Sequence, residues 1–182
     1  MSSTYTTQNE LLLRNLMDYY NSTGLLDTML AIISGESNIS LRIVDWFATN
    51  FSKKYWTQYP LGDKRFKVYI DYKLKLKAYS KRRFDPFCRW DRITIPYKTG
   101  THIETTIGQL NFFKWALENK VIDYIEENYA EIENDMNTRN STSRPKDSSG
   151  SNSKTRKKRE ELSVSASKSI KKEDVEIMIT FN

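Results

Sequence analysis

Residues 137–160 contain no large apolar side chain and consist mainly of Ser, Thr, Asn, Lys, Arg and Asp. A segment of this composition cannot bury enough apolar surface to offset the entropy lost on ordering, so it cannot belong to a core. One core typically serves roughly 100 to 200 residues, and the chain has 182. We therefore predict a globular domain over 5–136, a disordered basic linker over 137–161 and a C-terminal β-forming tail over 162–182.

Helix signals occur both early and late in the predicted domain. Thr7 and Glu10 have the spacing of a capping box, and the apolar residues that follow predict a helix over about 8–20. A second, shorter helix is expected over 25–33, and Ser40 is placed to cap a third. Thr106 and Gln109 repeat the capping-box spacing ahead of 107–136. That stretch fits either one long helix or two helices that meet near Asn119 and Lys120.

The clearest β pattern lies in 66–78, where apolar side chains occupy every even position. A period of two predicts one long strand or a bent pair of strands. A second alternation, over 93–105, surrounds a turn signal at 98–101 and predicts a hairpin. The predicted fold class is α+β, with helices packed on a small antiparallel sheet.

Charge is strongly segregated along the chain, although the net charge is only +6. Residues 64–92 and residues 137–172 each hold 11 basic and 3 acidic side chains, whereas 93–136 hold 3 basic and 8 acidic ones. Such asymmetry bears on partners rather than on the fold. It is compatible with a basic region that packs against an acidic helix of the same chain, and with an exposed surface that binds anions.

The first basic region supplies the candidate nucleic-acid or anion-binding residues, because lysines and arginines alternate there with aromatic rings. They are Lys73, Lys75, Lys77, Tyr79, Lys81, Arg82, Arg83, Arg89 and Trp90. A structural interpretation is equally open. Lysines on an exposed strand hinder pairing of that strand with the sheet edge of another molecule. Asp85 and Asp91 are close enough in the sequence to pair with the arginines. Phe84 and Phe87 are then expected to fill the core on either side of a turn at Pro86.

Two further candidate sites follow the predicted domain. The linker carries a basic cluster of the nuclear-localisation or phosphate-binding type at Lys154, Arg156, Lys157, Lys158 and Arg159. The tail ends in an apolar alternation, the predicted partner-binding residues Val175, Ile177, Ile179 and Phe181. Such a tail either returns to its own sheet or adds a strand to a partner.

Catalytic patterns are not found in the sequence. The six glycines form no phosphate-binding loop, His102 is the single histidine, and Cys88 lies in an aromatic stretch where a buried, inert thiol is expected. We therefore expect no enzyme, no cofactor and no metal site. Residues 1–9 lack the features of a signal peptide, and no run approaches the roughly 18 apolar residues of a membrane helix. A secreted or membrane-spanning protein is not expected.

Four stretches, 40–47, 72–87, 105–116 and 162–165, resemble a group of uncharacterised proteins of nucleocytoplasmic large DNA viruses. The resemblance covers about 40–182 apart from the linker, and it implies a viral protein located in the virion or inside the host cell, in cytoplasm or nucleus. We expect a noncatalytic structural or virion-assembly protein that binds other viral proteins through its tail and basic face. The alternative is a nucleic-acid-binding protein of viral transcription or genome packaging. The oligomeric state is left open.

Overall fold

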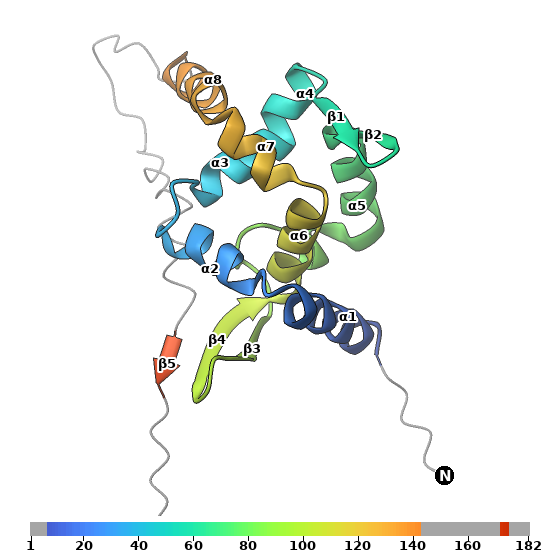
Figure 1. Ribbon diagram of the computed structural model, residues 1–182, viewed down its shortest axis with the longest axis vertical. Helices are drawn as coiled ribbons and strands as arrows, with labels where there is room; N and C mark the ends of the chain where they lie inside the picture. The colour runs from blue at the N-terminus through green and yellow to red at the C-terminus, as the bar shows by residue number, and fades with distance from the viewer. Residues whose placement is uncertain (1–6, 143–171, 175–182) are drawn as a thin grey trace, which may run out of the picture.

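The computed structural model describes residues 7–142 and 172–174. In chain order the elements are α1 (Gln8–Thr23), α2 (Leu26–Ser34), α3 (Leu41–Trp46), the π-helical turn η1 (Phe47–Phe51), α4 (Ser52–Lys54), β1 (Gln58–Leu61), β2 (Lys64–Lys67), α5 (Val68–Arg83), β3 (Arg92–Tyr97), β4 (Thr101–Thr106), α6 (Ile107–Glu118), α7 (Val121–Glu127), α8 (Tyr129–Thr142) and β5 (Lys172–Asp174). Helices and two small antiparallel sheets form the molecule (Figure 1). The predicted α+β class is confirmed.

The three N-terminal helices begin where the sequence predicts. The Glu10 amide donates to Thr7 Oγ1 over 3.3 Å, and the Thr7 amide donates to Glu10 Oε2 over 2.8 Å, which completes the capping box. Ser40 Oγ accepts from the Ile43 amide at the start of α3. Helix α3 continues through η1 into α4, so the third predicted helix contains a π-turn that no periodicity signals.

Helix α6 is the centre of the core, with α1 and α5 packed against it (Figure 1). Its side chains are buried on nearly every side, including Leu110, Phe112, Phe113 and Trp115. A helix that is apolar all round is expected to be covered all round. The hydroxyl of Tyr20 on α1 donates to the Leu110 carbonyl over 2.7 Å and fixes α1 on α6.

The segment that follows α5 lies directly on the first turn of α6. Gly108 permits this approach, because a Cβ at this position would meet the Arg82 carbonyl oxygen at 3.0 Å. The Asp85 amide donates to the Gly108 carbonyl, and Gln109 Nε2 donates to the Pro86 carbonyl. Gln109 therefore binds this segment and does not close a second capping box. Phe84 and Phe87 are buried, as predicted.

The second sheet contains the predicted hairpin and a third strand (Figure 1). Strands β3 and β4 pair antiparallel from Arg92↔Thr106 to Tyr97↔Thr101. Strand β5 adds to β4 with the pairs Ile103↔Lys172, His102↔Glu173 and Thr101↔Asp174. The described part of the tail thus returns to its own sheet. Val175, Ile177, Ile179 and Phe181, and the whole basic cluster at 154–159, lie outside the described residues.

The predicted strand over 66–78 is wrong, because β2 ends at Lys67 and a helix begins at Val68. The alternation conceals a second period. Val68, Tyr72, Leu76 and Tyr79 are spaced by four, four and three residues, which places them on one face of a helix. These four side chains face the core. The strand prediction counted every even position, and three of those, Ile70, Leu74 and Ala78, are exposed.

Residues 107–142 form three helices, so both predicted alternatives for 107–136 are wrong. The first break lies at the predicted place, where Lys120 adopts a φ of 58°. The second, at Asn128, has no sequence signal that we recognised. Helix α8 also continues past Met136 to Thr142, into the segment predicted as linker.

Candidate protein-docking surface

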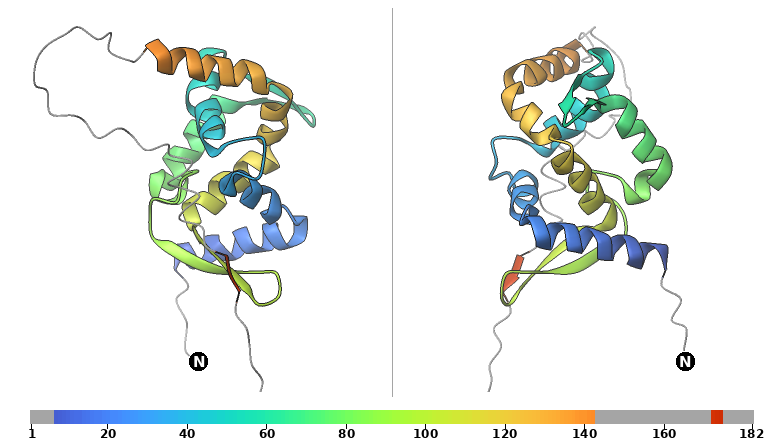
Figure 2. Two further views of the ribbon diagram at one scale, coloured as in Figure 1. Left: turned by 90° about the vertical axis from the view of Figure 1, so that its left-hand side faces the viewer. Right: turned by 45° about the vertical axis from the view of Figure 1, so that its right-hand side comes forward.

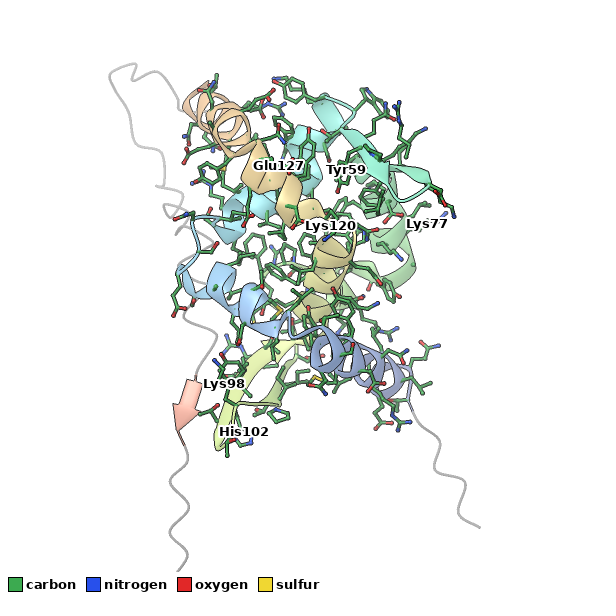
Figure 3. The ribbon with its side chains drawn as sticks, viewed as in Figure 1. Tyr59, Lys77, Lys98, His102, Lys120 and Glu127 are labelled. Atoms are coloured by element: carbon green, nitrogen blue, oxygen red, sulfur yellow. The ribbon has the colours of Figure 1, made fainter. Side chains whose placement is uncertain are left out.

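The helical conformation of 68–83 divides the predicted row of lysines. On a strand, Lys73, Lys75 and Lys77 share one side, but on α5 successive residues are rotated by about 100°. Lys73 and Lys77 lie one turn apart and are exposed, beside the exposed side chains of Ile70 and Leu74. Lys75 lies on another side of the helix and is half-buried. Figure 3 shows Lys77 at the outer side of α5.

The predicted arginines pair with nearby polar groups. Arg89 makes two hydrogen bonds to the buried carboxylate of Asp85, over 2.7 and 2.9 Å. Arg82 pairs with Asp91 over 3.1 Å, and Arg83 donates to the Gln8 side chain over 3.3 Å. The structural interpretation of these charges is confirmed for Asp85 and Asp91. Lys81 is exposed and follows Ser80, whose φ of 60° and ψ of 168° break the helix.

Arg82, Arg83 and Trp90 line one groove of about 500 Å³ at the start of α1. Its other lining residues include the carboxylates of Glu10 and Asp91, which largely cancel the two positive charges. Tyr79 does not join them, because its half-buried ring stacks on Phe84 with the ring centres 6.4 Å apart. The predicted binding residues therefore form no single basic surface.

Intramolecular neutralisation of the α5 lysines by the acidic helices is not observed either. Within residues 7–142, no ion pair joins Lys73, Lys75 or Lys77 to an acidic side chain. Figure 3 shows Lys77 on α5 well separated from Glu127 on α7. The positive charge on α5 thus faces outward.

An exposed apolar surface surrounds these lysines. Trp56 is 69% exposed, Leu74 60% and Ile70 42%. The turn that carries Trp56 follows α4, and the indole is presented by a left-handed backbone with a φ of 49°. With their neighbours they line a groove of about 540 Å³, which we call the α4–α5 face: Trp56, Tyr69, Ile70, Lys73, Leu74, Leu76 and Lys77. No carboxylate is among these residues.

A smaller cavity of about 230 Å³ adjoins the α4–α5 face and shares Trp56, Tyr69 and Ile70 with it. Thr57 lines this cavity and is 7% exposed. Its hydroxyl Oγ1 is buried and makes no hydrogen bond within the described part of the chain. A buried hydroxyl without a partner typically costs about 1 to 3 kcal/mol. Lys67 also lines the cavity, which extends the basic margin.

The position of the turn at Trp56 depends on Asp135 of α8. This carboxylate accepts from Trp46 Nε1 over 3.0 Å, from Lys54 Nζ over 2.8 Å and from the Tyr55 hydroxyl over 3.2 Å. Burial alone would raise the pKa of Asp135, but these hydrogen bonds and the charge of Arg139 outweigh burial and lower the pKa. Asp135 thereby connects α3 and α4 to α8 beside the turn that carries Trp56.

Two further titratable groups, Asp45 and Tyr72, are partly buried and have raised pKa values. Burial, together with the nearby Asp85 carboxylate, raises the pKa of Asp45 to about 6, although Arg89 and Lys81 oppose the shift. Burial also raises the pKa of Tyr72 to about 12.

Among the described residues, no three His, Cys, Asp or Glu side chains are grouped as a metal site. No helix of the described chain is both long and apolar enough to cross a bilayer.

Sequence reasoning missed Trp56, Ile70 and Leu74 as surface residues. The signal was present, because a helix needs only one apolar stripe to cover a core, and α5 carries more apolar side chains than that stripe uses. Had 66–78 been tested against a helical period, Ile70 and Leu74 would have remained as unexplained apolar residues beside two lysines.

Comparison with known proteins places the chain in a viral group. The chain is 48% identical over 118 residues to a protein of Acanthamoeba polyphaga mimivirus, "Uncharacterized protein L507", a match that covers 60% of this chain and 46% of the relative. The chain thus spans less than half the length of that relative. No solved structure gives a significant match. Residues 2–161 match a family described as "Family of unknown function (DUF7197)". The viral resemblance of the sequence is therefore confirmed, and the chain belongs to the DUF7197 family.

Proposed function

We propose that this protein is a noncatalytic structural or assembly component of virus particles, which binds another viral protein through the α4–α5 face. The observation that supports the proposal is the cluster of exposed Trp56, Ile70 and Leu74 side chains beside Lys73 and Lys77. Scattered apolar residues are normal on a protein surface, whereas a contiguous apolar patch with a polar rim is typical of interaction sites.

The composition of the face favours a protein partner over a nucleic acid. Surfaces that bind single strands stack bases on aromatic rings, and the face does hold Trp56 and Tyr69. Ile70, Leu74 and Leu76 add aliphatic groups, which suit apolar side chains of a protein rather than stacked bases. The lysines favour a partner segment with negative charge, which speeds encounter and sets orientation. The partner chemistry we infer is an acidic segment with alternating or helically spaced apolar side chains.

Particle incorporation tests this proposal. Tagged wild-type protein, a Leu74→Glu variant and a matched Leu11→Glu control at an exposed position of α1 are expressed in infected cells, and each is quantified by mass spectrometry in purified particles. We expect wild type and control in the particles and at least a tenfold loss for Leu74→Glu. Absence of the wild type from particles, or equal incorporation of Leu74→Glu at equal expression, would overturn the proposal.

Thr57 provides a sharper variant that separates binding from folding. Thr57→Val keeps the side-chain shape and removes the unpaired hydroxyl, so the free energy of unfolding should be unchanged or slightly increased. We infer that a bound partner supplies the missing hydrogen bond. Thr57→Val should therefore bind the viral partner protein several-fold more weakly than wild type does. Weaker binding together with unchanged stability supports docking at this cavity. Unchanged binding argues against a role for the hydroxyl.

A second function, nucleic-acid binding in viral transcription or genome packaging, is favoured by one observation. Arg82, Arg83 and Trp90 line a common groove, which places two guanidinium groups beside an exposed ring. Fluorescence anisotropy with duplex and single-stranded DNA at several salt concentrations tests it. A protein that contacts phosphates weakens steeply as salt rises. Salt-dependent binding that Arg82→Ala with Arg83→Ala abolishes would favour this function, and undetectable binding at about 100 mM salt would reject it.

A further inference from the structure

We infer that the segment which fills the α4–α5 face is residues 175–182 of a second copy of this chain. This inference rests on the proposed function and names the partner of the same surface. It would make the protein self-associating, with the tail of one copy on α5 of the next.

The chemistry of the segment complements that of the face. Residues 175–182 contain the acidic Glu176 and no basic side chain, and they directly follow Glu173 and Asp174 of β5. The apolar residues of the segment are Val175, Ile177, Met178, Ile179 and Phe181. An apolar segment with one negative and no positive side chain thus occurs in the same chain as a basic, apolar surface whose groove residues include no carboxylate. Charge complementarity of this kind selects partners and register.

The register of β5 brings the described part of the tail to the end of its partner strand. Asp174 pairs with Thr101, which is the first residue of β4. Because the strands are antiparallel, Asp174 lies opposite the start of β4. The turn at Lys98–Gly100 begins there, and β4 has no further residue to offer. Within the described residues, the tail is held in the chain's own sheet through Lys172–Asp174.

The arrangement of the molecule favours a second copy over the same copy as the receptor. Strand β5 lies beside β4 at one end, whereas α4 and β1, which flank Trp56, lie at the opposite end (Figures 1 and 2). A contact between different surfaces of two copies is head-to-tail, and such contacts generate rings or open chains. Both are forms of assembly that suit a particle component.

Charge exchange in the full-length protein tests the inference. Wild type, a face variant (Lys73→Glu with Lys77→Glu), a tail variant (Glu176→Lys with Thr180→Lys) and the fourfold combination are compared by sedimentation velocity over a range of concentrations. A contact of this size should be weak, with a Kd on the order of 10 μM or above. We expect wild type to self-associate, either double variant to lose about tenfold or more in affinity, and the fourfold variant to recover.

A matched control and a direct binding measurement complete the design. Arg14→Glu with Lys120→Glu changes two positive charges elsewhere and should not alter association. A labelled peptide of residues 173–182 should bind wild-type protein in fluorescence anisotropy, and binding should weaken with Leu74→Glu. A monomer at all concentrations, association without recovery in the fourfold variant, or no peptide binding would overturn the inference. If Leu74→Glu still prevents particle incorporation in those cases, the proposed function stands with a different partner.

Discussion

The indole Nε1 of Trp115 donates to the carboxylate Oδ1 of Asp71 over 2.7 Å, and this bond fixes the rotation of α5 on the core. Trp115 is 3% exposed in the centre of α6, and Asp71 lies in the first turn of α5. With Asp71 turned toward α6, Val68 and Tyr72 pack inward. The apolar side chains of Ile70 and Leu74 are then carried to the outside, where they line the α4–α5 face.

Asp71→Ala should destabilise the protein, because it leaves the buried indole N–H of Trp115 without a partner. Loss of such a hydrogen bond costs about 1 to 2 kcal/mol of the free energy of unfolding. Urea unfolding followed by fluorescence measures the difference. Asp63→Ala, in the exposed turn between β1 and β2, is the matched control and should change stability by less than about 0.5 kcal/mol. Equal effects of the two variants would show that the bond does not set the position of α5.

Local signals in the sequence were sufficient wherever structure depends on nearby residues. The capping residues Thr7, Ser40 and Thr106 all begin helices, and the turn at Lys98–Gly100 joins the predicted hairpin. Each of these depends on hydrogen bonds within a few residues, which spacing reveals. The burial of Phe84 and Phe87 was also predicted, since Pro86 fixes the turn between them.

The candidate site was not predicted, because it depends on the choice between strand and helix for 66–78, which the packing of α5 decides. The same apolar positions in 66–78 satisfy a strand period and a helix period, and contacts with α6 and η1 decide between them. Lys, Leu and Ala favour a helix, and the strand prediction underweighted that preference. The exposure of Trp56 follows from the anchoring of α4 and Tyr55 by Asp135, at a sequence separation that no local pattern covers.

Gly108→Ala should destabilise the protein, although alanine favours an isolated helix by about 1 kcal/mol over glycine. The new Cβ would lie 3.0 Å from the Arg82 carbonyl oxygen, and the backbone of 82–84 would have to move away from α6. Overpacking of this kind costs about 1 to 3 kcal/mol. Thermal unfolding should show a lower Tm than wild type. A higher Tm would mean that helix propensity outweighs the contact and that the segment 82–84 is free to shift.

Asp135→Asn should weaken the attachment of α8 and make the free energy of unfolding less sensitive to acid. Because hydrogen bonds and Arg139 lower the pKa of Asp135, its ionised form stabilises the fold above the ordinary value of 3.8. That stability is lost as the pH falls through the lowered pKa. We expect the variant to be less stable at neutral pH by about 1 to 3 kcal/mol and nearer to wild type in acid. Asp123→Asn, which alters an exposed pair with Lys120, serves as the control and should have little effect.

Asp45→Asn should have the opposite effect, because Asp45 is held in an environment that disfavours its charge. Burial raises its pKa from 3.8 to about 6, so the folded protein binds a proton more readily than the unfolded chain. The contribution of Asp45 to the free energy of unfolding is therefore greatest below about pH 4, and it is lost as the pH rises through 6. The variant should be more stable than wild type by about 1 to 2 kcal/mol at neutral pH, with no advantage in acid. Urea unfolding of both proteins between these limits measures the difference. An Asp45→Asn variant less stable than wild type at neutral pH would show that the ionised carboxylate is paired, and that Asp45 belongs to the ion-pair network of Asp85 and Arg89.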